Sequence, residues 1–534
     1  MLFCCVMVPT VWAQEFSLSG RVTDAANRAI SGASVQVKGK NASTLTGESG
    51  TFSLSLNVGD ILQVSYVGYT PEELTVTNQN PVTILLMEAN NDLDEVVVIG
   101  YGTARKRDLT GAVGSVKGDD IRQVPVTTAA QALTGKVAGV NVVTQSGAPG
   151  ADVNITVRGG TSITGSTAPL YVVDGFVMED ALMKIDANDI ENIDILKDAS
   201  ATAIYGARGA NGVVLITTKS AKSGRTAIDY NAYLSFERLS RKLDLLGVED
   251  YVKYQYEFQT LSGNTSRFAD MYGGDVDDPN FASGAYARIH SDYGTRAGID
   301  WQDEVFGGSA LLQNHNVNIS GGNEKTKLML SYNNTNQDGI LAKSGYRRNS
   351  VRAKVDHQLF KDVNIDFNSL FQDANRQGGG SLGGMLKMSA LQPATGGVRF
   401  TNEEMLYTDI GDEMQLLDSQ YDISNPIIMN DARSRERASR LANVNVGLTA
   451  KFLNDFTFRT QGSYQWGQTR TNFWDDGRTR DARNNGGPYG DIENAEGFEW
   501  QWTNTLSWMK DLGNHHINLM GGHEMRYEES QGLK

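Results

Sequence analysis

Short runs in which hydrophobic and polar residues alternate fill most of the chain. Nine such runs follow one another from Ala227 onward, among them AIDYNAYLSFE, KLMLSYNN and FTFRTQGSY. Each run has an apolar face and a polar face, and several have aromatic residues near their ends, which predicts antiparallel strands that separate an apolar environment from water. A soluble β-sandwich also alternates, so the alternation alone does not choose between the two architectures.

The connections between these runs differ in length in an ordered way. The tight connections GGNEK, LFKD, FLND and KDLGNHH all follow even-numbered runs. Long polar stretches, at Leu239–Leu311, Gln372–Arg440 and Gly467–Gly497, all follow odd-numbered runs. Short turns on one side and long loops on the other are typical of transmembrane β-barrels. We therefore predict antiparallel transmembrane barrel strands over residues 223–534.

The number of strands does not suit a complete barrel. Bacterial barrels usually have an even number of strands, because an open sheet edge is not tolerated in lipid. The sequence ends at ESQGLK, where an outer loop is expected. We therefore expect 223–534 to be the N-terminal part of an incomplete, truncated barrel; a complete nine-strand protein is the alternative.

Two smaller units precede the predicted barrel. Short alternating runs such as SGASVQVKG and GTFSLSL, separated by Gly, Asn and Asp, predict a small antiparallel β-sandwich over residues 15–89. Residues 104–222 mix short strands such as PLYVVDG with short helices, one of them from about Ala199 to Tyr205, and predict an α+β domain. The predicted fold class is therefore mainly β, with one α+β domain.

Charge and cysteine content limit the classes of function. A net charge of −15 argues against a nucleic-acid partner, because phosphate contacts need clustered Lys and Arg. The only cysteines, Cys4 and Cys5, lie in MLFCCVMVPTVWAQ, which we interpret as a signal peptide over residues 1–14 that lacks its positive n-region; a buried strand is the alternative. Export without further cysteines favours a bacterial envelope.

Candidate catalytic and metal-binding groups have simpler interpretations. Gly206, Gly209 and Gly212 follow a predicted helix and precede a strand, so tight turns are a better interpretation than a nucleotide loop. The acidic stretch Gly273–Asn280 could ligate calcium, but it lacks the ligand spacing of an EF-hand and favours a solvated loop. The six histidines do not show zinc-helix spacing, and no nucleophile has a base at suitable spacing. We predict no enzyme, no metal and no cofactor.

Several motifs carry a specific resemblance. The segments VRGG, PLYVVDG and LKDASATAIYGARGANGVVLITTK resemble the plug domain of SusC/RagA-type TonB-dependent outer-membrane transporters. The sandwich at GRVTDAANRAISGASVQVKG resembles the carboxypeptidase-regulatory-like domain that precedes such plugs. The resemblance implies a plug over 104–222. Its motif residues here are Arg158, Gly159, Gly160, Asp174, Gly175, Lys197, Asp198, Tyr205, Gly206, Arg208, Gly209, Asn211 and Gly212.

The segment DEVVVIGYGT lies where this family has its TonB box. The resemblance implies a TonB box and linker over residues 90–103, with the box formed by Asp94, Glu95, Val96, Val97, Val98, Ile99 and Gly100. The β-branched residues favour an extended backbone that can join the sheet edge of a partner. The basic cluster ARKRD that follows is too short for nucleic acid and favours a solvated flank.

The resemblance also implies a function. It implies active import of a nutrient, an oligosaccharide first and an oligopeptide second, across the bacterial outer membrane, as TonB and its inner-membrane motor proteins pull on the box and remodel the plug. The implied partners also include a SusD-like surface lipoprotein, the nutrient ligand and outer-membrane lipid. A signal-transducing receptor and a non-transporting surface adhesin remain as alternatives. Tyr407, Trp466 and Trp474 could stack on sugar rings, but barrel girdles are equally rich in such residues, so the substrate-binding residues stay unassigned.

Overall fold

A computed structural model describes residues 16–24, 27–40, 42–66, 69–87, 96–99, 102–105, 113–159, 165–198, 202–221, 223–378, 381–407, 424–513 and 515–533. The chain divides into two compact units, residues 1–97 with 104–108, and residues 98–103 with 109–534. The predicted signal peptide lies outside the described residues. Among the described helices, none is long and apolar enough to cross a membrane.

The first unit contains a β-sandwich, as predicted. One sheet has the order β4 (Thr51–Leu56), β1 (Phe16–Thr23), β7 (Val82–Leu85), and the other has β3 (Ser43–Leu45), β2 (Ser34–Val37), β5 (Ile61–Ser65), β6 (Glu72–Thr75). Alternate residues of both sheets, including Leu18, Val35 and Leu62, form one buried core. The expectation of a fully antiparallel sandwich is wrong for β1 and β7, which pair in parallel. Alternation of side chains reports burial and does not report strand direction.

The plug region of the second unit is built on a five-stranded sheet. Its order is β10 (Val113–Lys117), β15 (Ile190–Leu196), β16 (Val213–Thr218), β13 (Leu170–Val173), β14 (Phe176–Val177), and β11 (Val140–Thr144) pairs with β12 (Val153–Val157) beside it. The short helices are α1 (Gly118–Arg122), α2 (Ala129–Ala132) and α3 (Ala181–Lys184), with 3-10 helices at Ala187–Asp189 (η3) and Ala203–Gly209 (η4). An apolar core that includes Ile193, Ile195 and Ile216 joins these elements.

One helix expectation needs correction. The helix predicted from about Ala199 to Tyr205 is, within the described residues, the 3-10 helix η4, and it runs on to Gly209. Gly206 interrupts it with a φ of +57°, a left-handed conformation that glycine adopts without steric cost.

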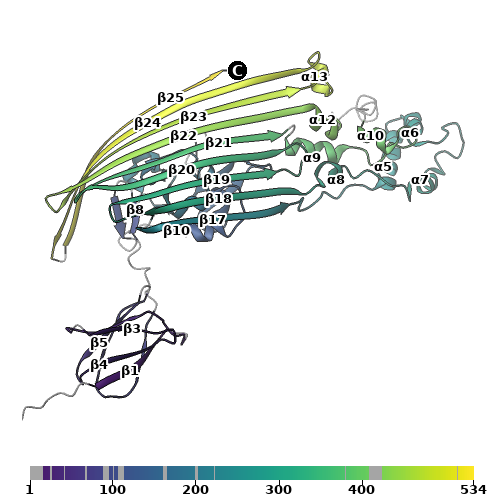
Figure 1. The fold of residues 1–534 in the computed structure, drawn as a ribbon. Coiled ribbons are helices and arrows are strands. Elements are labelled where there is room, and N and C mark those ends of the chain that lie inside the picture. The colour runs from purple at the N-terminus through teal and green to yellow at the C-terminus, as the bar shows by residue number, and fades with distance from the viewer. Residues whose placement is uncertain are drawn as a thin grey trace, which may run out of the picture. The chain divides into compact units, whose positions relative to one another are not determined.

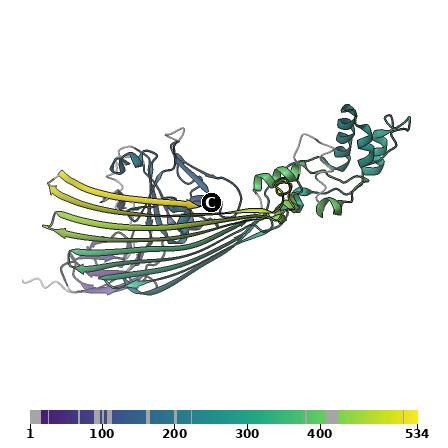
Figure 2. The same cartoon turned by 90° about the horizontal axis from the view of Figure 1, so that it is seen from above.

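The remaining strands form a single antiparallel wall of nine strands in sequential order (Figures 1 and 2). They are β17 (Gly224–Glu237), β18 (Ala310–Gly322), β19 (Thr326–Asp338), β20 (Gly345–Phe360), β21 (Val363–Gly378), β22 (Arg433–Phe452), β23 (Phe456–Asp475), β24 (Tyr489–Leu512) and β25 (His515–Leu533). Each corresponds to one of the nine predicted runs. The wall curves, and the plug lies against its concave face (Figure 2).

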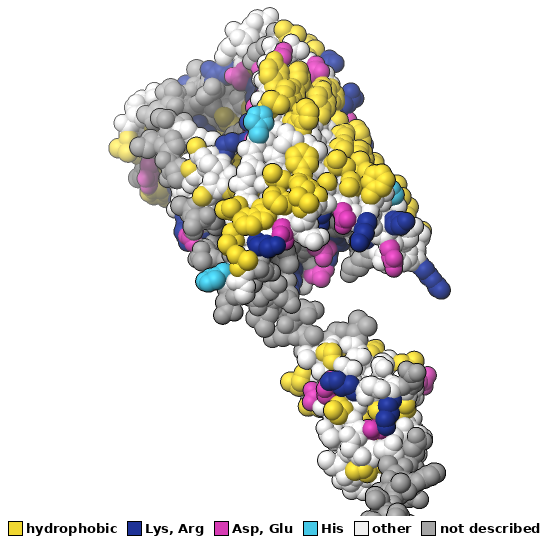
Figure 3. Space-filling model, turned by 90° about the vertical axis from the view of Figure 1, so that its left-hand side faces the viewer, with side chains coloured by type: hydrophobic (Ala, Val, Ile, Leu, Met, Phe, Trp, Pro, Cys, Tyr) yellow, Lys and Arg dark blue, Asp and Glu magenta, His cyan; other side chains and the backbone are white. Residues whose placement is uncertain are grey.

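The two faces of the wall have opposite character. On β19, Leu328, Leu330 and Tyr332 point outward and are exposed, whereas Ser331 and Asn333 point inward and are buried. Hydrophobic side chains gather along one side of this unit in the space-filling view (Figure 3). Outward apolar residues and inward polar residues are the pattern of a wall between lipid and a wet lumen.

The connections follow the predicted order, but one predicted loop is mostly strand. All four tight turns follow β18, β20, β22 and β24. The stretch Gly467–Gly497, expected to be a loop, is mostly strand, because β23 continues to Asp475 and β24 begins at Tyr489. A strand of 20 residues extends about 68 Å at about 3.4 Å per residue, much more than an apolar band of about 25 Å. Its outer part has water on both faces, so the alternation that marks a membrane strand is lost there.

The long links contain helices that the polar sequence did not predict. The link from β17 to β18 contains α5 (Val248–Leu261), α6 (Thr265–Tyr272), α7 (Ala285–Tyr293) and α8 (Trp301–Phe306). Later links contain α9 (Leu382–Leu391), α10 (Asn402–Tyr407), α12 (Pro426–Ala432) and α13 (Arg480–Asn484). The helices α5 to α7 share an aromatic core, with Tyr256, Phe268 and Tyr272 in ring contact. They lie beyond the strand ends that are opposite the tight turns (Figure 1).

The outward face generates a prediction with a matched control. Val446 on β22 is 41% exposed and Val276 in an outer link is 43% exposed. If both side chains faced water, the same substitution should therefore change stability by similar amounts. If the outward face lies in lipid, Val446→Arg destabilises the folded wall by about 2–4 kcal/mol, whereas Val276→Arg has little effect. Urea titration of the protein in vesicles, read by heat-modifiable gel migration, measures the difference. Equal effects of the two variants would show that this face is not in lipid.

Candidate functional site

Asp174 and Gly175 form the turn that presents the plug to the wall. They connect β13 to β14 with φ values of +50° and +94°, and Val173 pairs with Phe176 across the turn. Positive φ at both central residues is the geometry of a type I′ hairpin, for which Asp-Gly is a preferred sequence. The sequence VVDGF therefore specifies this turn locally.

The carboxylate of Asp174 is the centre of a polar network between plug and wall. Arg352 Nη2 and Lys354 Nζ of β20 lie 3.4 and 3.3 Å from its Oδ2, and Asn368 Nδ2 of β21 donates to the same oxygen at 2.9 Å. The backbone N–H of Thr218 donates to Oδ1 at 2.9 Å. Burial acts to raise the pKa of Asp174, but the two cations and the Thr218 hydrogen bonds outweigh it, and the pKa lies below its usual value.

A second group of contacts joins the start of β15 to the wall. Arg348 Nη2 donates to Asp186 Oδ2 at 2.7 Å, and the Arg348 side chain is 0% exposed. Ser331 Oγ donates to Asp189 Oδ1 at 2.6 Å, and Asn188 Nδ2 donates to Asn314 at 3.2 Å. Burial raises the pKa of Asp189, because Arg352 and Ser331 only partly compensate for its lost hydration.

Neither these wall residues nor the acids Asp186 and Asp189 were predicted as site residues from the sequence. A usable signal is present on β20, where Arg348, Arg352 and Lys354 occupy alternate positions. Basic residues spaced by two or four along a strand share one face. Their partners depend on how the plug is positioned against the wall. The periodicity of one strand carries no information about that position.

Most of the other predicted plug-motif residues stabilise the plug itself. Arg158 pairs with Asp198, Lys197 Nζ donates to Ala138 O at 2.6 Å, and Asn211 Nδ2 donates to Ser166 O at 2.9 Å. Arg158, Gly159 and Gly212 have positive φ values, and a Cβ on Gly212 would lie 3.0 Å from Val157. Arg208 instead reaches the wall, at 3.4 Å from Glu524 of β25. Tyr205 and Gly209 belong to η4, and Gly160 lies outside the described residues.

The predicted TonB box is described only in part. Val96–Ile99 forms β8, which pairs with β9 (Gly102–Arg105) in a two-stranded sheet. Asp94, Glu95 and Gly100 lie outside the described residues.

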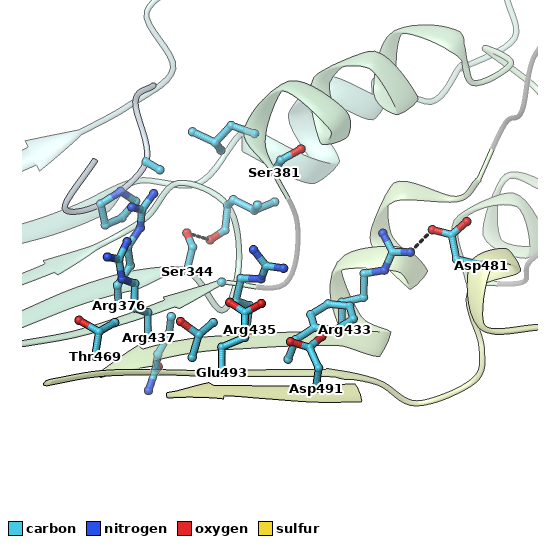
Figure 4. Close-up of a pocket in the computed structure, with 18 of the residues that line it drawn as sticks. Ser344, Arg376, Ser381, Arg433, Arg435, Arg437, Thr469, Asp481, Asp491 and Glu493 are labelled. Carbon is cyan, nitrogen blue, oxygen red and sulfur yellow. Dashed lines mark hydrogen bonds and ion pairs between the residues drawn. The ribbon is translucent and has the colours of Figure 1, made fainter. Parts of the chain in front are cut away.

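A cavity of about 1040 Å³ lies between the plug and the outer part of the wall (Figure 4). The plug contributes Ala148 and Pro149, and α9 contributes Leu382. Inward residues of β21 to β24 supply charged, hydroxyl and aromatic groups, namely Arg376, Arg433, Arg435, Arg437, Thr469, Thr471, Phe473, Tyr489, Asp491 and Glu493. These side chains could bind a polar ligand by hydrogen bonds and ion pairs.

The aromatic residues considered for sugar stacking do not line this cavity. Trp474 of β23 is exposed, at a position that alternates with inward Phe473. Trp466 donates its indole N–H to Glu496 at 2.8 Å, and Tyr407 belongs to α10. Phe473 and Tyr489, whose ring centroids are 5.7 Å apart, are the aromatic residues that sequence reasoning missed.

The acidic stretch at Gly273–Asn280 uses its carboxylates locally. Asp275 accepts the N–H of Asp277 at 3.0 Å, and Asp278 accepts the N–H of Asn280 at 2.8 Å. Over the part of the chain that the structure describes, His, Cys, Asp and Glu form no group of three suited to a metal ion.

Comparison with known proteins gives matches over both units. A family described as the TonB-dependent receptor plug domain matches residues 105–213, and the carboxypeptidase-regulatory-like domain matches residues 18–98. Neither description is of a catalytic domain.

Curated relatives match across most of the chain. The TonB-dependent receptor SusC of Bacteroides thetaiotaomicron is 35% identical over 428 residues, 78% of this chain and 39% of SusC. The TonB-dependent receptor P26 of Formosa agariphila is 34% identical over 524 residues, 95% of this chain and 48% of P26. The chain therefore spans about half or less of the length of these two relatives.

A solved structure has the same fold. A chain of the RagAB peptide importer in its open-open state superposes with a TM-score of 0.64 at 25% identity, covering 82% of this chain and 49% of that chain. The plug match, the similarity to SusC and this superposition agree with the nine-stranded wall and its plug. The chain belongs to the SusC/RagA family of TonB-dependent receptors, which are β-barrel proteins of the bacterial outer membrane.

Proposed function

We propose that the protein imports a nutrient oligomer across the outer membrane, with TonB acting on the segment around Val96–Ile99 to remodel the plug. The observation that carries this proposal is the polar interface between the plug and the wall, which we call the seat of the plug. Asp174, Asp186 and Asp189 bind side chains of the wall. Among the described residues, the wall contributes only Leu370 and Leu441 to the apolar core of the plug.

Such a seat suits a plug that must be released and restored. Buried polar groups bind strongly inside a protein but are rehydrated when exposed, so opening the interface costs less than exposing an equal apolar area. Arg348 Nε, Arg352 Nη1 and Asn333 Nδ2 are buried and have no protein partner among the described residues. Each such group costs about 1–3 kcal/mol, which water would recover on opening.

The coupling step requires an extended segment that a partner can hold. Val96–Ile99 already has strand conformation in the pair with β9. TonB would add its own sheet edge to this segment, so that main-chain hydrogen bonds carry the pulling force. The inner-membrane motor proteins would supply that force, and a SusD-like surface lipoprotein would cover the outer opening.

An oligosaccharide is our first choice of cargo and an oligopeptide our second. The identity to SusC, 35%, exceeds the 25% identity to the RagAB chain, and the latter complex is described as a peptide importer. The match of residues 18–98 to a carboxypeptidase-regulatory-like domain argues against a signalling receptor.

The first prediction concerns the coupling segment. Val97→Pro should abolish nutrient uptake, because proline removes a backbone donor that strand addition needs, whereas Val97→Ala should retain most uptake. Growth on the cargo as sole carbon source measures uptake, and heat-modifiable migration verifies that both variants are folded. Deletion of residues 94–99 with uptake intact would refute the proposed coupling.

The second prediction concerns the buried ion pair between plug and wall. Asp186→Asn leaves the Arg348 guanidinium buried without a counter-charge and should destabilise plug seating by about 3–5 kcal/mol. Replacing both partners, as Asp186→Asn with Arg348→Met, should recover much of that loss. Protease accessibility of the plug and conductance in planar bilayers report seating. A double variant as loose as the single one would contradict the pairing.

The third prediction concerns pH. The pKa of Asp174 is lowered in the folded protein, so its contribution is complete above its unfolded pKa of about 3.9 and is lost as pH falls through the folded value. Besides Arg352 and Lys354, Asp366 of β21 acts electrostatically on this site. The difference in plug seating between wild type and Asp174→Asn should therefore shrink below about pH 4. A difference that does not change with pH would exclude an ionised Asp174.

A further inference from the structure

Three arginines of the cavity lie together at the strand pair β21 and β22. Arg376 and Arg437 are direct cross-strand partners, and Arg435 is two positions from Arg437 on the same inward face. Like charges directly opposite one another on neighbouring strands destabilise a sheet. Figure 4 shows Arg376 and Arg437 lying beside one another at the cavity.

None of these three arginines forms an ion pair with a carboxylate among the described residues. Arg433, the next inward residue of β22, is paired with Asp475 at 3.0 Å and with Asp481. Among the described residues, Arg376 and Arg437 make no ion pair or hydrogen bond, and Arg435 only stacks on Phe473, 5.3 Å from the ring centroid. The cavity therefore contains a cationic group that a bound anion would stabilise.

The acids Asp491 and Glu493 of the cavity belong to a different strand, β24. In the register of the wall, Arg437 is opposite Thr471, and Thr471 is opposite Glu493; Asp491 is likewise opposite Phe473. The backbones of Glu493 and Asp491 are thus two strands from those of Arg437 and Arg435, about 10 Å at the usual strand spacing, and three strands from that of Arg376. Thr469 and Thr471 lie on the strand between, β23.

This order of groups matches a particular ligand chemistry. Guanidinium groups bind carboxylate or sulfate oxygens with two parallel hydrogen bonds. Threonine hydroxyls and carboxylates bind the hydroxyl groups of a sugar, and the ring of Phe473 offers an apolar face. Each unit of a sugar acid carries hydroxyl groups beside its carboxylate, so it can bind the arginines and the acids together. A glutamate side chain carries no hydroxyl group for Asp491 and Glu493 to bind.

We propose that this cavity selects an acidic oligosaccharide, whose carboxylate or sulfate group is held by Arg376 and Arg437. This inference rests on the proposed function only in that the cavity is the outer substrate site. Arg437 also lines a second cavity of about 540 Å³, which Lys184 of the plug borders. Arg437 therefore lines both cavities, and the ligand would pass it on the way from one to the other.

Binding to the purified full-length protein tests the proposal by calorimetry. The probes are an oligogalacturonide, a sulfated oligosaccharide, a neutral maltooligosaccharide of equal length and a glutamate-rich peptide. The wild type should bind an acidic sugar at least tenfold more tightly than the neutral one, with affinity that falls as salt rises. Arg376→Gln with Arg437→Gln should weaken acidic-sugar binding on the order of tenfold or more per arginine, and weaken neutral-sugar binding much less.

A matched control removes the same charge from the other face. Arg347 of β20 and Arg470 of β23 alternate with inward residues and line none of the described cavities, so Arg347→Gln with Arg470→Gln should leave binding unchanged. Equal affinity for acidic and neutral sugars, no binding of either acidic sugar, or preference for the acidic peptide would overturn the proposal. Uptake that survives deletion of residues 94–99 would refute the proposed transport function, but it would not alter these binding results.

Discussion

The wall has an apolar outer face and a polar inner face, and this difference determines which interactions can hold the plug against it. Its strands present apolar residues such as Leu330 outward, and period-two alternation then leaves the intervening positions, such as Ser331 and Asn333, for the inner face. The inner face is therefore polar before any plug is considered. A domain seated against it cannot be held mainly by the hydrophobic effect, which stabilises its own interior.

The plug meets this constraint by placing acids where the wall places bases. Asp174 does so from a hairpin turn whose conformation the Asp-Gly sequence itself favours, and Asp186 does so just before β15. Hydrogen bonds and ion pairs depend on direction, so they fix the orientation of the plug, which apolar contact alone would not. They also lose less free energy on hydration than apolar contacts do, which suits the release and return proposed for the plug.

Whether a part of the fold could be predicted depends on how far apart in the sequence its interacting residues lie. Alternation and turn residues are local, and they predicted the nine strands and the position of the four tight turns. The Asp174–Gly175 hairpin is also specified locally, but the sequence PLYVVDG was interpreted only as a strand. Strand direction in the sandwich was not predictable, because β1 and β7 are distant in sequence and pair in parallel. The outer parts of β23 and β24 were missed because both of their faces meet water. Asp186 and Arg348 were missed as a pair because 162 residues separate them, as were Arg376 and Arg437, whose proximity depends on strand register.

The aromatic core of α5 to α7 affects the conformational entropy that the outer link would lose when a ligand binds. A long polar link without its own core would have to be ordered by the ligand, at about 1–2 kcal/mol for each residue fixed. Here Phe268, Tyr272 and their neighbours order the link during folding, before any ligand arrives. Recognition at the outer end of the wall can then rely on a preorganised surface, on which single exposed residues change specificity without refolding the link.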